Sequence, residues 1–397
     1  MKTILVVILV IFMLSALLLA FVACDMESAA GHTWSGLPEM RMIASSSMFG
    51  STCMAIAADN SLWGRSQNLH GQLGDGTTIS RHYFVQIGTR TDWATVATGI
   101  DHTVAIKTDG SLWAWGSNNL GQLGDGTGGR LANTGRHEPI QVGIDTDWVS
   151  IAAGGSHNVA IRADGSLWAW GINSDGQLGD GTRGPVGTLG AGDRELVLEP
   201  TQIGEDLDWA FVAASYGRTM AIRTDGTLWG WGQNARVGFC YGALGLGDDI
   251  SARVLSPTQV GTDTDWAYVS MGSSHGLAIK TDGTLWAWGN NLMGQLGNGA
   301  GGYAGARSTV PIQVGTDTDW VKAAAGRSHS IAIKSDGTLW GWGSRFHGQF
   351  DSGISTGGFE MLGPVQFAPF AEWVYVATGS DRTTAICANG SIRTWGS

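Results

Sequence analysis

Histidine is the residue type in this sequence best suited to chemistry, because a neutral imidazole can act as a general base or bind a metal ion. One repeated position, eleven residues before a tryptophan, holds four of them: His102, His157, His275 and His329. Other copies of the same position hold threonine or arginine, at Thr52, Arg218 and Arg382. A catalytic base is needed once, in a single constellation. A position shared by many copies therefore predicts a structural hydrogen bond between strands.

Acidic residues also recur, in Gly-Asp-Gly-Thr stretches at residues 124–127 and 179–182. A calcium ion takes about six to eight oxygen ligands. One aspartate per stretch falls short of that number, so turn formation explains these residues better. No phosphate-binding loop, Ser/His/Asp arrangement or paired-carboxylate cluster stands out from the repeat. We therefore expect no enzymatic activity, no cofactor and no metal ion.

A repeat of about 55 residues organises the chain. Its anchor is Asp-Gly-Ser/Thr-Leu-Trp, which ends at Trp113, Trp168, Trp229, Trp286 and Trp340, with weaker copies at residues 59–63 and 389–393. A second tryptophan follows two residues later, and a third, preceded by an acidic residue, begins the next unit. These three series contain 18 of the 19 tryptophans, and a period of this size indicates a solenoid or a propeller.

Each unit is expected to form four β-strands. Residues 156–162 alternate with the period of a strand, the Asp-Gly at residues 164–165 predicts a hairpin turn, and residues 167–170 return as the partner strand. Residues 200–203 begin with a proline and suit an outer strand. The small residues after Trp148 suit an inner strand at a crowded centre. Four such strands make one propeller blade.

These repeats resemble the regulator-of-chromosome-condensation repeat family. Its motifs are represented by Gly-x-x-His at residues 99–102, by Asp-Gly-Ser-Leu-Trp-Ala-Trp-Gly at residues 109–116 and by Asn-x-x-Gly-Gln-Leu-Gly at residues 118–124. The resemblance implies an all-β fold, a seven-bladed β-propeller of four-stranded antiparallel blades. It also implies protein interaction, because members act as exchange factors for small GTPases, bind chromatin or, in bacteria, inhibit secreted enzymes.

The seventh copy lacks a loop and an outer strand before Ser397. We expect residues 36–40, or their neighbours, to complete the last blade from the N-terminal side. Ring closure brings Cys53 near Cys387, but an offset of four residues along the strands, about 13 Å, is too long for a disulfide. Together with Cys240, these cysteines are expected to be small buried apolar residues, and a structural disulfide among the scattered cysteines is the alternative.

The N-terminus is expected to be an export signal followed by a membrane attachment. An apolar stretch follows Lys2, and Phe21-Val22-Ala23-Cys24 resembles a bacterial lipobox, in which the cysteine becomes the lipidated first residue. An uncleaved anchor helix is the alternative. We predict residues 1–23 as signal or anchor, residues 24–42 as a segment that supplies the closing strand, and residues 43–397 as a propeller outside the cytoplasm.

Departures from the repeat are the best guide to a binding surface. Several units carry extra residues after the Gly-rich loop, at 183–198, 235–256 and 300–309. Arginine and aromatic residues are enriched at interface hot spots, and loops on a rigid scaffold commonly carry function. The candidate interface residues are therefore Arg183, Arg194, Arg236, Phe239, Tyr241, Arg253, Tyr303 and Arg307.

We expect a monomeric, non-enzymatic scaffold in the cell envelope that binds a protein or a surface ligand. The sequence has 34 acidic against 23 basic residues and no basic stripe, which argues against nucleic acid as a partner. Two alternatives stay open: an exchange factor for a small GTPase and an inhibitor of a secreted enzyme. Export counts against the first, because it removes the protein from GTP.

Overall fold

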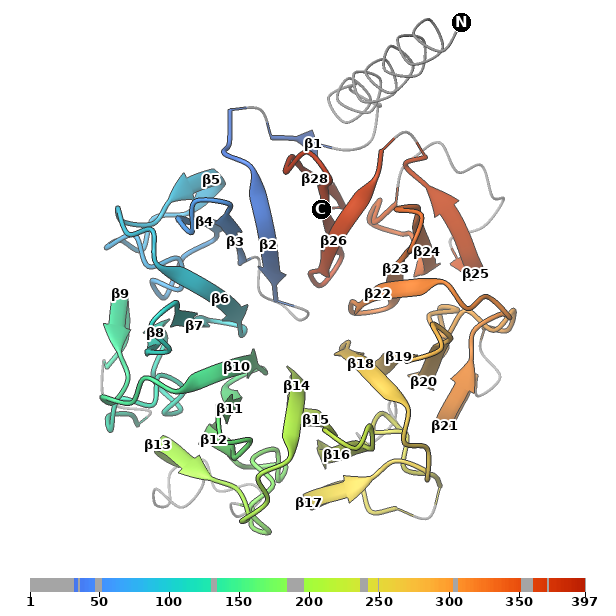
Figure 1. Ribbon diagram of the computed structural model, residues 1–397, viewed down its shortest axis with the longest axis horizontal. Coiled ribbons are helices and arrows are strands. Elements are labelled where there is room, and N and C mark those ends of the chain that lie inside the picture. The colour runs from blue at the N-terminus through green and yellow to red at the C-terminus, as the bar shows by residue number, and fades with distance from the viewer. Residues whose placement is uncertain are drawn as a thin grey trace, which may run out of the picture.

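The computed structural model describes residues 32–34, 36–46, 52–129, 134–183, 196–235, 242–248, 250–302, 306–350, 360–369 and 371–396. These residues form seven four-stranded antiparallel sheets around a central axis (Figure 1). The expected fold, an all-β propeller with seven blades, is confirmed. The expected signal or anchor, including Cys24, lies outside the described residues. Within the described ranges, no helix has the length and apolar character needed to cross a bilayer.

Each blade has an inner, a second, a third and an outer strand, and we number blades 1 to 7 by their inner strands. The inner strands are β2 (Met40–Ser45), β6 (Trp93–Thr98), β10 (Trp148–Ala153), β14 (Trp209–Ser215), β18 (Trp266–Met271), β22 (Trp320–Ala325) and β26 (Trp373–Thr378). The second strands are β3 (Cys53–Ala57), β7 (His102–Lys107), β11 (His157–Arg162), β15 (Arg218–Arg223), β19 (His275–Lys280), β23 (His329–Lys334) and β27 (Arg382–Cys387). The third strands are β4 (Leu62–Ser66), β8 (Leu112–Gly116), β12 (Leu167–Ile172), β16 (Leu228–Gln233), β20 (Leu285–Asn290), β24 (Leu339–Ser344) and β28 (Ile392–Gly396). The outer strands are β5 (Arg81–Gln86), β9 (Arg136–Gln141), β13 (Leu196–Gln202), β17 (Arg253–Gln259), β21 (Arg307–Gln313), β25 (Glu360–Phe367) and, in blade 7, β1 (His32–Thr33).

The N-terminal side of the chain closes the ring. Strand β1 pairs with β28, so that it becomes the outer strand of blade 7 (Figure 1). The sequence prediction centred this pairing on residues 36–40, but the structure places it just upstream, because Met40 already begins the inner strand of blade 1. Trp34 follows β1, and its indole N–H donates to Thr394 Oγ1 at 3.4 Å while its ring lies edge-on to Phe84 at 5.5 Å. This side chain therefore contacts both the last and the first blade.

The hydrophobic core lies between neighbouring blades. One cluster joins Met54 and Leu62 of blade 1 to Trp93, Val96 and Trp115 of blade 2, and similar clusters link the later blades. A single four-stranded sheet cannot bury both of its faces, so each blade depends on its neighbours for burial.

The cysteines differ from one another. Cys53 is free and buried, so it does not pair with Cys387, in agreement with the offset of the strands. Cys387 forms a disulfide, and its partner lies outside the described residues. The expectation that Cys387 is only a small apolar residue is therefore wrong. Sequence spacing alone does not reveal which distant cysteines a fold brings together.

Candidate functional site

The strand order gives the propeller two unlike faces. The hairpin face, as we call it, carries the turns between second and third strands and the connections into each inner strand. The loop face carries the turns after the inner strands and the Gly-rich loops before the outer strands. On the hairpin face, the turn of one blade contacts the connection into the next, as where Trp148 N donates to the Gly110 carbonyl at 3.2 Å.

On the loop face, one carbonyl oxygen joins neighbouring blades. The Gln122 carbonyl of blade 2 accepts hydrogen bonds from the Trp170 indole at 3.2 Å and from the Asn158 amide at 2.7 Å, both in blade 3. The Gln177 carbonyl of blade 3 accepts similarly from Trp231 at 3.0 Å and from Thr219 at 2.8 Å. The repeated Gly-Gln-Leu-Gly loop is thus a joint between blades.

The four repeated histidines extend this joint. Nε2 of each lies within hydrogen-bond distance of the next blade: 2.9 Å for His102–Asn158, 3.0 Å for His157–Thr219, 2.8 Å for His275–Ser330 and 3.4 Å for His329–Thr383. These contacts cross between blades, whereas the sequence suggested bonds between strands. Burial lowers the pKa of His102 and His329 to about 4 and that of His157 and His275 to about 3. The imidazoles are therefore neutral at pH 7.

Steric crowding by the histidine ring explains why glycine stands at the first position of the Gly-x-x-His motif. A Cβ atom on Gly99 would lie 2.1 Å from Cε1 of His102, and one on Gly154 would meet His157 at the same distance. Real Cβ atoms do not approach other atoms so closely, so glycine lets the imidazole pack against the backbone. The motif is thereby explained as a packing unit.

The aspartates of the Gly-rich loops are occupied by turn contacts. Asp125 Oδ1 accepts hydrogen bonds from Thr127 N and from Asn118 Nδ2, each at 3.0 Å, and Asp125 also pairs with Arg136 at 3.0 Å. In the part of the chain that the structure describes, no three His, Cys, Asp or Glu side chains gather as they would around a metal ion.

Three of the expected interface residues lie among the described residues, all on the loop face. Arg253 pairs with Asp175 of the preceding blade at 2.6 Å, and Arg307 approaches Asp248 of the preceding blade at 3.8 Å. Both arginines therefore help to join blades, while Arg183 is exposed. The other five lie outside the described residues: Arg194, Arg236, Phe239, Tyr241 and Tyr303. Their part in binding stays a prediction.

On the hairpin face, a cation packs between tryptophan rings and carboxylates. In blade 3, the Arg162 guanidinium lies 4.4 Å from the Trp148 ring centre and 3.9 Å from that of Trp168. It also contacts Asp145 and Asp147. The corresponding cations in blades 2, 4, 5 and 6 are Lys107, Arg223, Lys280 and Lys334. The acidic residue before the first tryptophan is evident in the sequence, whereas the role of the cation, which stands two residues before each of these Asp-Gly pairs, was not predicted.

The exposed charge of the hairpin face is consequently negative. The five cations are recessed, at 2 to 17% side-chain exposure, whereas their nine carboxylate partners are 40 to 56% exposed. The hairpin aspartates add to this charge, because hydrogen bonds from Ser111 lower the pKa of Asp109, and the other hairpins repeat the arrangement.

Apolar side chains stand among these carboxylates. Val149, Val321 and Val374 follow the first tryptophan of their inner strands and are 47 to 57% exposed. Each lies at a β-bulge, where the pairing of the inner strand with the second strand shifts by one residue. The bulge turns the side chain out of the sheet and towards solvent. The hairpin face thus combines exposed apolar side chains with negative charge.

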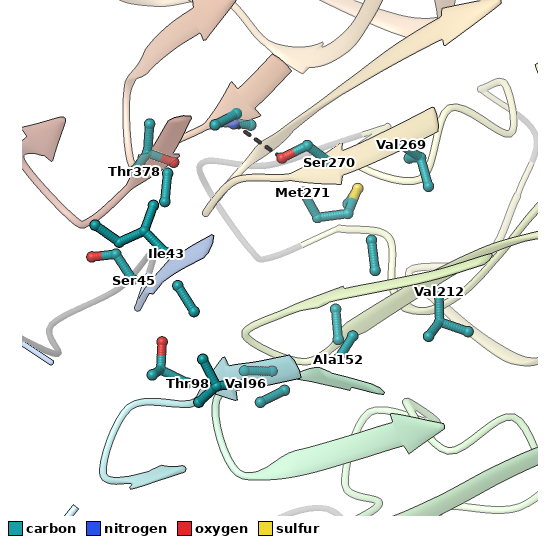
Figure 2. A pocket seen from close by; sticks show the side chains of 18 of the residues that line it. Ile43, Ser45, Val96, Thr98, Ala152, Val212, Val269, Ser270, Met271 and Thr378 are labelled. Carbon is teal, nitrogen blue, oxygen red and sulfur yellow. Dashed lines mark hydrogen bonds between the residues drawn. The ribbon is translucent and has the colours of Figure 1, made fainter. Parts of the chain in front are cut away.

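A cavity of about 210 Å³ lies on the axis and is lined by all seven inner strands. Figure 2 shows apolar side chains such as Ile43, Val96 and Val212 in its wall, together with the hydroxyl groups of Thr98 and Thr378. A dashed line in the same view marks the hydrogen bond from Ala325 N to Ser270 Oγ, at 3.1 Å. Small inner-strand residues keep this space open.

Comparison with known proteins agrees with this architecture. A family model described as "RCC1-like domain" matches residues 31–315, and one for the regulator of chromosome condensation (RCC1) repeat matches residues 320–349. The chain belongs to the RCC1-like domain family. This RCC1-like propeller is 28% identical to the ultraviolet-B receptor UVR8 of Arabidopsis thaliana, over 84% of its own length and 72% of the receptor.

Other relatives share less of their length or sequence with this RCC1-like propeller. It is 29% identical to the human E3 ubiquitin-protein ligase HERC2, over 62% of its length but only 5% of the ligase. Among solved structures, human WBSCR16 gives a TM-score of 0.70 at 20% identity, covering 92% of this chain and 89% of that one. Prp20p of Saccharomyces cerevisiae gives 0.68 at 19%, covering 90% and 82%. At these identities the solved structures support the fold alone.

The neutral histidines of this RCC1-like propeller predict loss of stability in mild acid. Their folded pKa values of about 3 to 4 lie below the ordinary value of 6.5, so unfolding takes up protons between these limits. The free energy of unfolding should be highest above pH 6.5 and should fall as the pH drops towards 4, by up to about 1.4 kcal/mol per pH unit for each histidine. Urea unfolding at a series of pH values measures this slope.

A pair of variants isolates the contribution of one histidine. His157→Asn should unfold with a shallower pH dependence, by about one proton. His82→Asn, which changes an exposed histidine in β5, should keep the wild-type slope. Equal slopes in His157→Asn and the wild type would show that the buried imidazole does not drive the acid sensitivity.

Proposed function

We propose that this protein is a non-enzymatic scaffold that binds another protein on its hairpin face. The observation that carries the proposal is the pattern on that face, where exposed valines accompany carboxylates whose cations are recessed. Protein interfaces combine apolar contacts with polar groups. Charge complementarity favours a partner with basic residues around an apolar contact.

The loop face is a weaker candidate for the primary docking surface. There the repeated polar groups join neighbouring blades. The glutamine carbonyls accept hydrogen bonds from the next blade, and Arg253 and Arg307 pair with carboxylates of the preceding blade. Solved relatives support a binding role for the fold in general terms. One structure is of Kap60 bound to yeast RCC1, and another concerns the binding of Prp20p to Gsp1p and histones. These partners are known for those proteins only.

Photo-crosslinking from single positions tests the proposed surface. A photoreactive amino acid at Val321, on the hairpin face, should give a protein adduct in cells that express the full chain. The same probe at Arg183, exposed on the loop face, is the matched control and should give much less of that adduct. Val149→Glu together with Val374→Glu should reduce the Val321 adduct several-fold, because the added charge opposes an apolar contact.

The outcome of this experiment separates the alternatives. An adduct from Arg183 alone would place the partner on the loop face and would overturn the assignment of the hairpin face. An adduct with a small GTPase from either position would favour the exchange-factor alternative. An adduct with a secreted enzyme whose activity the propeller blocks would favour the inhibitor alternative.

We also propose that the protein is exported and attached to a membrane through a lipid on Cys24. This proposal rests on the resemblance of residues 21–24 to a lipobox and on the preceding apolar stretch. The relatives named above are eukaryotic, so they do not bear on it. Radiolabelled palmitate should enter the full chain and should not enter Cys24→Ser. A labelled Cys24→Ser protein, or an unlabelled wild-type protein in the cytosol, would overturn the proposal.

A further inference from the structure

The seam between blades 7 and 1 has a different chemistry from the joints between other blades. At the joint between blades 1 and 2, Thr103 and Trp115 both donate hydrogen bonds to the Gln72 carbonyl. These two donors are register partners on the second and third strands of blade 2. In blade 1 the register partners at the same two positions are Cys53 and Arg65. A cation therefore stands at the seam where blade 2 has an indole.

Arg65 is a buried cation with unused hydrogen-bond donors. It is 7% exposed, and its Nε and Nη2 atoms have no hydrogen-bond partner in the described chain. Its guanidinium carbon lies 5.2 Å from the ring centre of Trp34 and 5.6 Å from that of Phe84. These rings favour the charge, but they do not replace the hydrogen bonds to water that the guanidinium loses on burial. A buried charge without a counter-ion is costly, so a negatively charged acceptor would stabilise this side chain.

A second guanidinium lies at the same seam, on blade 7. Arg382 stands at the repeated position that holds histidine in four other blades, and its strand β27 packs against β2 of blade 1. It is half-buried, and its Nε has no hydrogen-bond partner among the described residues. Burial lowers the pKa of Arg382, and the charge of Arg65 lowers that pKa further. Burial raises the pKa of the Cys53 thiol, and the charges of both arginines oppose that rise. Two cations therefore lie close together around one buried thiol.

No carboxylate of the described residues balances these two charges. Neither guanidinium forms an ion pair within that part of the chain. Asp381 precedes Arg382 in the sequence, but it pairs with Arg327 of blade 6 at 3.6 Å. The other polar groups beside the Cys53 thiol are hydroxyls, since Thr384 hydrogen-bonds with the thiol and its Oγ1 lies 3.5 Å from Oγ1 of Thr394. Two arginines with free donors and no acid are the composition of an anion site.

We propose that the seam between blades 7 and 1 binds a small inorganic oxyanion, such as phosphate or sulfate. Arg65 donates to it from the buried side through Nε and Nη2, and Arg382 donates from the more open side. The planar donor fork of arginine matches the oxygen atoms of such ions. Because Arg65 is nearly enclosed, the site suits a free ion better than a phosphate group on a large molecule. The bound ion would join the first and last blades, and this site is separate from the docking surface proposed above.

Titration calorimetry of the full chain with inorganic phosphate tests the site, in a buffer without other oxyanions. Phosphate should bind the wild type, and sulfate should compete with it. Arg65→Met, which keeps the length of the side chain without its charge, should bind phosphate at least about ten-fold more weakly, as expected for lost charge-assisted hydrogen bonds. Arg382→Gln should weaken phosphate to a similar extent. Arg90→Gln removes an exposed cation of the hairpin face and should leave the affinity unchanged.

Thermal unfolding distinguishes a bound ion from the general stabilisation that phosphate gives to proteins. At constant ionic strength, phosphate should raise the unfolding temperature of the wild type more than that of either seam variant, because an ion that binds only the folded state stabilises it. Without phosphate, Arg65→Met should be at least as stable as the wild type, because it removes an unpaired buried charge. Absence of phosphate binding by the wild type would overturn the proposal. Unchanged affinity in folded Arg65→Met or Arg382→Gln would place the ion elsewhere and would overturn it as well.

Discussion

The carbonyl of the Gly-Gln-Leu-Gly loop is the group on which the ring depends. This is the carbonyl of the glutamine, which lies in the Gly-rich loop of one blade. It accepts hydrogen bonds from two side chains of the next blade: a buried indole N–H and the side chain that follows the histidine position. The donors are buried, so an unmatched partner would cost about 1–3 kcal/mol. Each joint therefore fixes the angle between two sheets that the hydrophobic clusters alone would hold less specifically. Glutamine carbonyls make such joints from blade 1 to blade 4 and from blade 5 to blade 6, the Ala243 carbonyl accepts the Trp288 indole between blades 4 and 5, and β1 closes the ring against β28.

The two faces of the propeller differ in the groups that they expose to solvent. The loop face is built around the joints, and its described arginines are largely engaged with carboxylates of neighbouring blades. On the hairpin face, cations are buried beneath tryptophan rings and the carboxylates remain outside. Charge pairs that stabilise each blade thus also set the sign of the surface. The bulges after three of the inner-strand tryptophans then add the exposed side chains of Val149, Val321 and Val374.

Much of the fold was predictable because the repeat supplies its own alignment. Asp-Gly turns, alternating strands and the small residues of the inner strands led to seven blades, and the comparisons agree. The closing strand was placed slightly too far along the chain, because nothing in residues 32–40 distinguishes a partner for β28 from the start of β2. The disulfide of Cys387 depends on a long-range contact that spacing does not encode.

The candidate sites were harder to predict from the sequence than the fold. Arginine-rich insertions suggested an interface, but Arg253 and Arg307 proved to contact acidic residues of the preceding blade, which lie far away in the sequence. The axial cavity was not foreseen, since its lining residues come from the inner strands of all seven repeats.

A double-mutant cycle across one joint measures the central claim most directly. His275 and Ser330 lie in blades 5 and 6, with Nε2 and Oγ 2.8 Å apart. If the joints couple the blades, His275→Asn and Ser330→Ala should interact by about 1 kcal/mol or more in the free energy of unfolding, whereas His275→Asn and Thr103→Ala, in distant blades, should be additive. Additive effects for the first pair would show that the histidine contact does not hold neighbouring blades together.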